Sequence, residues 1–285
     1  MPGVRELLRR SRSDLLLGAG LIGWIGLVLM LDAVRSWTGV EPLRQSVLGA
    51  ATWLVLILAL RRETPLVRAQ TLIVVGLATL VEYTFSPLLH AYVYRIGTVP
   101  LFVPPGHGLV YLAALTLGRS ALLRARPRIP VAVTVLVGAC WAGYGVFGTA
   151  RTDLLGLFWF GCLLGFLRWG RSRLLYTGAF VVVSLLEVAG TGLGTWTWAA
   201  HDPVLGVIGQ GNPPSGSAGG YGWFDLYALL LAPRLLAVTG RLRSRRRAGR
   251  PGTVGSAGQV PQHLVVQLAV GGDGAAAERP VGPVE

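Results

Sequence analysis

Long apolar runs dominate the first 240 residues of this chain, and short segments rich in arginine, glycine and proline separate them. Runs of about 15 to 20 residues with few or no charges are long enough to cross a hydrocarbon core about 30 Å thick as α-helices. The pattern predicts an all-α fold, a polytopic integral membrane helix bundle of about eight transmembrane helices. The predicted spans are residues 15–33, 46–60, 70–89, 106–122, 129–148, 153–168, 174–192 and 221–240.

Composition supports this interpretation, and charge adds an orientation. Hydrophobic residues make up 52% of the 285 residues and charged residues only 14%, too few for the surface of a soluble domain of this size. All 26 basic residues are arginines; 22 fall on one set of alternate loops and four, Arg35, Arg44, Arg95 and Arg151, on the other. The positive-inside rule then predicts a multi-pass protein of the cell membrane with both termini cytoplasmic. Topology therefore accounts for the net charge of +13, and no nucleic-acid partner is predicted.

The chain contains a candidate internal repeat. The segments "RRETPLVRAQTLIVVGLATLVEYTFSPLLHAYVYR" and "RWGRSRLLYTGAFVVVSLLEVAGTGLGTWTWAA" each run from a basic loop through an apolar helix to a glutamate. Alternating aromatic residues follow about ten positions later, and a proline-rich loop comes next. The sequence thus predicts two parallel four-helix halves, residues 1–128 and 129–242, followed by a disordered cytoplasmic tail at 243–285. Chance similarity between apolar segments is the alternative explanation of the repeat.

Two glutamates, Glu82 and Glu187, occupy matched positions near the ends of the third and seventh predicted spans. An ionisable residue inside a span is costly and indicates function by default. The low dielectric of the membrane and the C-terminal end of a helix both disfavour a negative charge, so each side chain is suited to act as a general acid. The alternative is that each glutamate caps a polar group of a neighbouring helix or reaches the lipid headgroups.

Further polar and aromatic candidates are predicted near the outer membrane surface. Asp225, at the start of the last span, is a third catalytic candidate, although the same carboxylate could simply complement the helix dipole. Aromatic side chains here form either an interfacial belt or a pocket whose π-faces stabilise a cation. The candidate substrate-binding residues are His90, Tyr92, Tyr94, His107, Trp196, Trp198, His201, Asn212 and Trp223.

Several motifs exclude other classes of site. The G-T-G-L-G run at 190–194 follows an apolar helix instead of a strand, so it is not a dinucleotide-binding turn; its glycines are better suited to close packing and helix termination. The histidines lack metal-ligand spacing, and the two cysteines, Cys140 and Cys162, lie in apolar runs as small filler. No metal and no cofactor are predicted.

The segment "EVAGTGLGTWTWAAHDPVLG" resembles the carotenoid-biosynthesis membrane family that includes the bisanhydrobacterioruberin hydratases. The similarity lies in a Glu, a Gly three and seven positions later, and alternating aromatics before a Leu-Gly. The other half, "EYTFSPLLHAYVYRIGTVPLFVPP", is similar but has Ser86 and Pro87 in place of the glycines. The resemblance covers about 35 residues in each half. It implies cofactor-independent addition of water across a double bond of a carotenoid.

The leading hypothesis is an enzyme that hydrates or cyclises an isoprenoid lipid, with Glu82 and Glu187 as acid and base. Protonation of a trisubstituted alkene gives a tertiary cation that aromatic faces stabilise. Integral-membrane terpene cyclases also use paired acids, so cyclisation belongs to the same hypothesis. The alternatives are a transporter or lipid-binding membrane protein without enzymatic activity, and a scaffold whose basic tail recruits partners. The sequence leaves the lipid and the oligomeric state open.

Overall fold

A computed structural model describes residues 2–34 and 40–248, with side chains for residues 12–34 and 40–241. The chain divides into two units, Met1–Arg241 and Leu242–Glu285. The first unit holds the helix bundle, and of the second only the helical residues 242–248 belong to the described part. Most of the predicted tail at 243–285 therefore lies outside the described residues.

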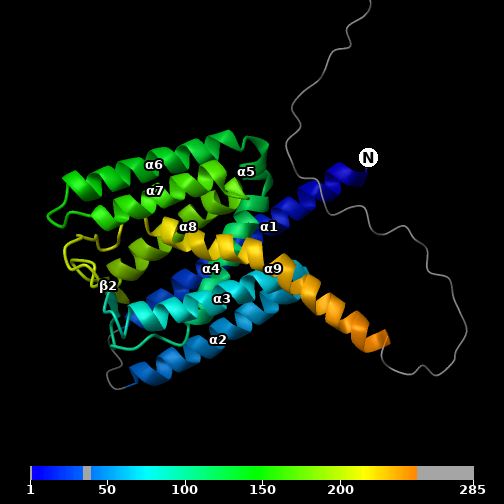
Figure 1. Ribbon diagram of the computed structural model, residues 1–285, viewed down its shortest axis with the longest axis horizontal. Helices are drawn as coiled ribbons and strands as arrows, with labels where there is room; N and C mark the ends of the chain where they lie inside the picture. The colour runs from blue at the N-terminus through cyan, green and yellow to red at the C-terminus, as the bar shows by residue number, and fades with distance from the viewer. Residues whose placement is uncertain (1, 35–39, 249–285) are drawn as a thin grey trace, which may run out of the picture. The chain divides into compact units, whose positions relative to one another are not determined.

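The described chain is mainly helical, as predicted (Figure 1). The helices, in chain order, are α1 (Pro2–Ala33), α2 (Glu41–Arg61), α3 (Pro65–Phe85), α4 (Val103–Arg119), the short α5 (Ala121–Ala125), α6 (Arg128–Phe147), α7 (Leu154–Trp169), α8 (Arg173–Gly192) and α9 (Ser217–Ala248). Local sequence explains where several of these helices begin. Prolines stand in the first turn of α2, α3 and α4, where no backbone N–H is needed. Thr64 caps α3 by accepting the N–H of Val67, and Asp153 caps α7 by accepting that of Gly156.

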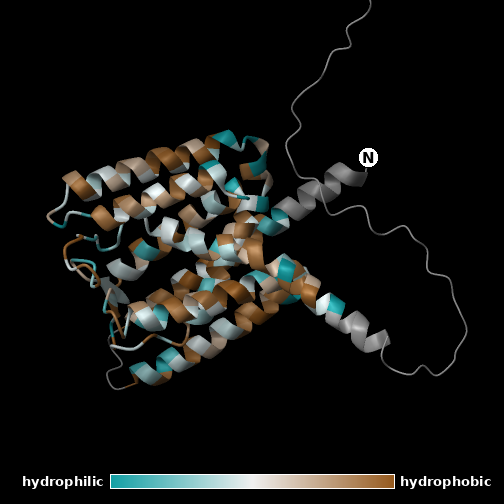
Figure 2. Ribbon diagram, in the orientation of Figure 1, coloured by the Kyte–Doolittle hydropathy of each residue, from teal (hydrophilic) through white to brown (hydrophobic). Residues whose placement is uncertain are grey.

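Six of these helices are long and apolar enough to cross a membrane: Arg12–Ala33, Glu41–Arg61, Pro65–Phe85, Arg128–Phe147, Arg173–Gly192 and Ser217–Arg241. Helix α7 is apolar but shorter, with 16 residues, and α4 has 17. Apolar residues run along the outer helices of the bundle, and polar residues gather in the loops (Figure 2). Large side chains such as Leu80, Leu88 and Leu136 are among the exposed ones. Such exposure would be unfavourable in water, and it is what a bundle surrounded by lipid requires.

Helix α4 lies at the centre of the bundle, in contact with α1, α2, α3 and α8. Its side chains from Leu109 to Ala114 are almost fully enclosed. Glycines allow α4 and α8 to approach closely, since a Cβ at Gly178 would lie 2.4 Å from the Ala114 carbonyl oxygen. A Cβ at Gly118 would likewise lie 2.8 Å from the Leu174 carbonyl oxygen. Close backbone contact through small residues is how membrane helices gain packing energy without a hydrophobic driving force. The core thus combines elements of both predicted halves.

A small antiparallel sheet was not predicted. Strand β1 (Tyr92–Tyr94) follows α3, and β2 (Trp196–Trp198) follows α8. The register pairs Tyr92 with Trp198 and Tyr94 with Trp196. The signal was present, because Y-V-Y and W-T-W alternate with the period of two that a strand requires. The alternation was a feature of the candidate repeat, and no strand was predicted from it.

The predicted spans agree with the eight longer helices to within a few residues at most ends. The third prediction, 70–89, is displaced toward the C-terminus, because α3 begins at Pro65 and ends at Phe85. The helix ends there with Ser86, and the chain then turns through His90, whose φ of 57° is left-handed. Hydropathy alone continued the span through the apolar Leu88 and Leu89, which belong to this turn.

Candidate functional site

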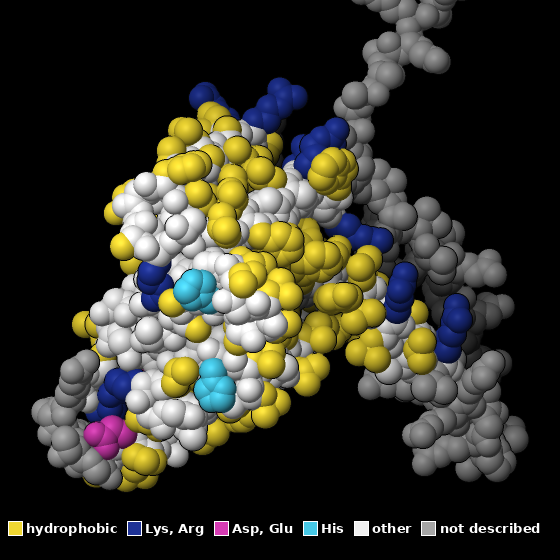
Figure 3. All heavy atoms as spheres, turned by 60° about the vertical axis from the view of Figure 1, so that its left-hand side comes forward, with side chains coloured by type: hydrophobic (Ala, Val, Ile, Leu, Met, Phe, Trp, Pro, Cys, Tyr) yellow, Lys and Arg dark blue, Asp and Glu magenta, His cyan; other side chains and the backbone are white. Residues whose placement is uncertain are grey.

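A cavity of about 340 Å³ lies where the ends of α3 and α8 meet the start of α4, α9 and the small sheet. Its wall is mainly apolar and aromatic. Glu82 of α3 and Glu187 of α8 both line it, although 105 positions separate them in sequence. Seen from this end, the molecule has a largely neutral surface with histidine and scattered arginine side chains (Figure 3). The aromatic lining residues are Trp24, Phe85, Tyr92, Tyr94, Phe102, Trp159, Trp196, Trp198, Tyr221, Trp223 and Phe224.

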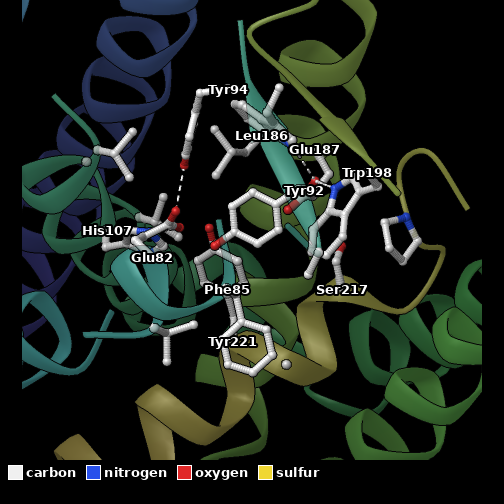
Figure 4. A pocket seen from close by; sticks show the side chains of 18 of the residues that line it. Glu82, Phe85, Tyr92, Tyr94, His107, Leu186, Glu187, Trp198, Ser217 and Tyr221 are labelled. Atoms are coloured by element: carbon white, nitrogen blue, oxygen red, sulfur yellow. Dashed lines mark hydrogen bonds and ion pairs between the residues drawn. The ribbon is translucent and has the colours of Figure 1, made fainter. Parts of the chain in front are cut away.

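Glu82 has a hydrogen-bonding partner at each carboxyl oxygen. The hydroxyl of Tyr94 donates to Oε2 at 2.7 Å, and Nε2 of His107 lies 2.9 Å from Oε1. All three side chains are buried. Tyr94 comes from the sheet and His107 from the first turns of α4, so three elements converge on this one carboxyl group (Figure 4).

His107 is held by more than Glu82. Its ring stacks on Tyr221 of α9 with centroids 5.3 Å apart and an interplanar angle of 24°, and Phe224 meets it edge-on. Nδ1 is buried and has no hydrogen-bonding partner among the described residues.

Glu187 has a different environment. The indole N–H groups of Trp196 and Trp198 both donate to its Oε2, each at 3.1 Å. Oε1 accepts no hydrogen bond from any described residue. Figure 4 shows Glu187 and Trp198 across the cavity from Glu82 and His107, with the ring of Tyr92 between the two sides. One carboxyl oxygen is thus fixed by two donors, and the other remains available.

The small sheet positions the aromatic partners of both glutamates. Tyr92 and Trp198 pack with ring centroids 4.7 Å apart, and Tyr94 and Trp196 with centroids 6.2 Å apart. The glycine run of the sequence has its role here. A Cβ at Gly190 would lie 1.8 Å from the Trp196 ring, so only glycine leaves room for this indole. Gly194, with a φ of 70°, supplies the left-handed turn between α8 and β2.

The two strand tyrosines keep their hydroxyl protons. Burial raises the pKa of the Tyr94 phenol well above its usual range, and the neighbouring Glu82 charge raises it further. Burial also raises the pKa of Tyr92, again with a contribution from Glu82. Tyr94 therefore remains a hydrogen-bond donor to Glu82 at any physiological pH.

A network that the sequence interpretation missed holds the long segment before α9 at the cavity. Asp153 accepts the backbone N–H groups of Gly211 and Ser215. The fully buried Gln210 donates to the carbonyl of Ala91 at 3.0 Å and lines the cavity. Arg151 donates to the carbonyls of Trp198, Ala199 and Gln210. Arg151 offered a signal, since an arginine on the arginine-poor side of a membrane protein needs a structural reason.

A comparable anchor lies near β1. The carboxyl group of Asp32 is buried and forms an ion pair with Arg95 at 2.8 Å, while Gln45 donates to its other oxygen. Arg44 donates to the backbone carbonyls of Asp32 and Val34. Three of the four arginines on the arginine-poor side thus bind loop carbonyls or a carboxylate, and Arg35 lies outside the described residues.

The other predicted site residues fall into two groups. The residues that line the cavity are Tyr92, Tyr94, His107, Trp196, Trp198 and Trp223. His90 and His201 are exposed and do not line it. Asn212 lies beside it, with its side-chain oxygen accepting the backbone N–H of Trp198. Asp225 is buried on α9 but is not part of the cavity wall.

Within the described chain, no group of three or more His, Cys, Asp or Glu side chains is arranged to hold a metal ion. Cys140 is exposed and Cys162 partly buried, and both are free thiols. The cavity wall offers carboxyl, imidazole, phenol and indole groups. No protein-family model matches this chain, and no curated protein and no solved structure is significantly similar to it. Function is accordingly inferred from the cavity.

Proposed function

We propose that this protein is a membrane enzyme that acts on a double bond of an isoprenoid or carotenoid-type lipid by acid–base catalysis, as a hydratase or a cyclase without a redox cofactor. One observation carries the proposal: two buried carboxyl groups, Glu82 and Glu187, line the same apolar, aromatic cavity. An apolar wall suits a hydrocarbon substrate, and two carboxyl groups with different partners suit a general acid and a general base.

Glu187 is the general acid in this proposal. Its Oε2 accepts hydrogen bonds from two indole N–H groups, so this oxygen is not the one that carries the acidic proton. A proton on the carboxyl group then resides on Oε1, which accepts no hydrogen bond from the described residues. That proton is transferred to the less substituted carbon of a trisubstituted alkene, which leaves a tertiary cation and a carboxylate. The two indole donors stabilise the carboxylate as it forms.

Glu82, with His107 and Tyr94, is the general base. Each of its carboxyl oxygens has a hydrogen-bonding partner, the phenol of Tyr94 and the imidazole of His107, and an imidazole can take a proton onward. In hydration, Glu82 takes a proton from the water whose oxygen attacks the cation. In cyclisation, a second double bond attacks the cation, and Glu82 removes a proton from the adjacent carbon. In both reactions Glu187 gives one proton and Glu82 takes one, so the number of protons on the protein is unchanged.

The aromatic wall supports a cationic intermediate. Tyr92 lies between the two carboxyl groups and packs on Trp198, so π-faces border the space where positive charge develops. A cation over an aromatic face gains about 2 kcal/mol or more when both are removed from water.

The proposed architecture consists of two parallel halves with cytoplasmic termini. The order three helices, strand, helix occurs twice, as α1–α2–α3–β1–α4 and α6–α7–α8–β2–α9. The strand register is self-complementary, as a twofold axis between Val93 and Thr197 would require. His107 is the fifth residue of α4 and Tyr221 the fifth of α9, and these two stack on each other. These features support two parallel four-helix halves with eight spans, and the arginine distribution supports cytoplasmic termini.

Substitution of the glutamates tests the function. Glu187→Gln and Glu82→Gln are each expected to lower conversion of a polyprenoid or carotenoid substrate in isolated membranes by about 10²- to 10⁴-fold, because each removes a proton-transfer group. Asp14→Asn is a matched control, since this carboxylate lies outside the cavity wall. Unchanged product formation by either glutamine variant would refute the assignment. Proton-coupled uptake into vesicles that the same variants abolish, without any conversion, would identify a transporter instead.

A further inference from the structure

Asp225 is a third buried acid, and its carboxyl group makes no hydrogen bond with any described residue. It lies on α9, one helical turn beyond Tyr221, and does not line the cavity. An ionised carboxylate buried without a partner is strongly unfavourable, most of all within a membrane. Burial is tolerable if the group carries a proton. Its burial is therefore not explained by the acid and the base of the cavity.

Two phenols near Asp225 are also without partners. The hydroxyl groups of Tyr111 on α4 and Tyr176 on α8 are buried and make no hydrogen bond with described residues. Tyr111 packs in one buried cluster with Ala228 of α9, and Phe224, next to Asp225, packs against that cluster. Tyr176 stacks on Phe166, whose ring meets that of Trp223, also on α9. Three helices thus place three oxygen groups around one stretch of α9, each able to donate or accept a proton and none hydrogen-bonded within the described structure. The cluster lacks a second acid, a histidine and a thiol, so its chemistry suits a proton and not a divalent metal.

We propose that Asp225, Tyr111 and Tyr176 form a second proton-binding site, and that Tyr221 and His107 connect it to Glu82. The proposal concerns proton exchange within the protein, so it holds or fails independently of the lipid chemistry proposed above.

The geometry of α4 and α9 provides the connection. Tyr111 follows His107 by four residues, and Asp225 follows Tyr221 by four, so each pair shares a helix face. The first members of the two pairs, His107 and Tyr221, stack with their ring centroids 5.3 Å apart. Tyr221 lines the cavity together with Glu82 and Glu187, and it lies one helical turn before Asp225 on α9. It is therefore the side chain that stands between the second site and the cavity.

His107 has the atoms that such a connection needs. Nε2 faces Glu82, and the buried Nδ1 is unpaired within the described structure. These groups are not hydrogen-bonded to one another, so each transfer between them needs a bridging water. A proton that leaves Asp225 passes through water to a phenol oxygen of Tyr221 or Tyr111 as that hydroxyl releases its own proton. Nδ1 receives the released proton through a second water, and Nε2 gives its proton to Glu82. Asp225 ends as a carboxylate and Glu82 as a carboxylic acid, with no net loss or gain.

Nuclear magnetic resonance of ¹⁵N-histidine-labelled protein in lipid nanodiscs tests the connection without any substrate. The chain has only four histidines, so His107→Gln identifies the resonances of this ring. Exchange of the His107 ring proton with water is expected to slow by about tenfold or more in Asp225→Asn and in Tyr221→Phe, since a proton-transfer group has been removed. Asp14→Asn, which changes an acid outside the cavity wall that pairs with Arg119, is expected to leave the rate unchanged. An unaltered rate in a folded Asp225→Asn protein would overturn the connection.

Infrared spectroscopy tests whether Asp225 carries a proton, and the conservative variant Asp225→Glu controls for misfolding of Asp225→Asn. The carbonyl band of a protonated carboxylic acid is expected in the wild type, absent in Asp225→Asn and shifted in Asp225→Glu, which should also restore exchange at His107. If no band depends on residue 225, the group is ionised and the proposal fails. If the band appears only after sodium and potassium are removed, the site binds a monovalent cation and the proposal also fails.

Discussion

The two sides of the cavity hold the same functional group in contrasting surroundings. Glu82 has one partner on each oxygen, a phenol and an imidazole, whereas Glu187 has two indoles on a single oxygen. Phenol and imidazole can exchange protons, but an indole N–H only donates a hydrogen bond. In the proposed function, the Glu82 side passes protons, and the Glu187 side holds an anion once its proton has gone. Similar positions in sequence have acquired different chemistry through their partners.

The largest expected effect comes from filling the space that the Glu187 side reserves for Trp196. A leucine at position 190 would collide with the indole ring, so Gly190→Leu should destabilise the protein by about 3 kcal/mol or more. Thermal unfolding followed by tryptophan fluorescence measures this. Gly192→Leu is the matched control, because a Cβ at this glycine of the same helix meets no atom within 4 Å. Equal destabilisation by the two variants would contradict the role given to Gly190.

Removal of single donors should separate the two sides more finely. Trp196→Phe and Trp198→Phe each take one N–H from Glu187 Oε2, and Tyr94→Phe takes the hydroxyl from Glu82. Each change should raise the barrier to conversion by about 1 to 3 kcal/mol, the cost of one charge-assisted hydrogen bond. The double variant Trp196→Phe/Trp198→Phe should lose more than either single variant, because no other donor reaches that oxygen. Steady-state conversion rates in membranes check this, and a double variant no slower than the slower single variant would contradict the role given to the two indoles.

The smallest expected effect is a dependence of stability on alkaline pH. The pKa values of Tyr92 and Tyr94 are raised by burial, so the unfolded chain releases these phenol protons at lower pH than the folded protein. Their contribution to stability is complete below the ordinary tyrosine pKa of about 10 and is lost as the pH rises above it. Tyr92→Phe and Tyr94→Phe should each flatten the fall of the unfolding temperature with pH. A slope identical to that of the wild type would show that neither phenol is protected.

Much of the architecture was predictable because its causes are local. Apolar length predicted the helices, the arginine distribution predicted an arginine-poor end, and the matched glutamates predicted two acids near one another. The alternation in Y-V-Y and W-T-W indicated the strands. Their pairing depends on which segments meet in the folded chain, and local sequence does not show that. His107 was predicted as a binding residue, but its contact with Glu82 joins positions 25 residues apart across a helix boundary.

By itself, the sequence determined a membrane-type helical chain with buried acids near one end of its helices, since hydropathy, helix length and charge act through nearest neighbours and solvent. The tertiary structure decided which groups share a cavity. It placed two glutamates, one histidine and the paired aromatics together, and it left Asp225 one turn away with unpaired phenols. Such contacts depend on how closely the neighbouring segments approach one another. Gly178 and Gly190 permit a close approach because they have no side chain to occupy the space. No local pattern encodes the shape of that space, and for this reason the roles of the acids emerged only from the packed bundle.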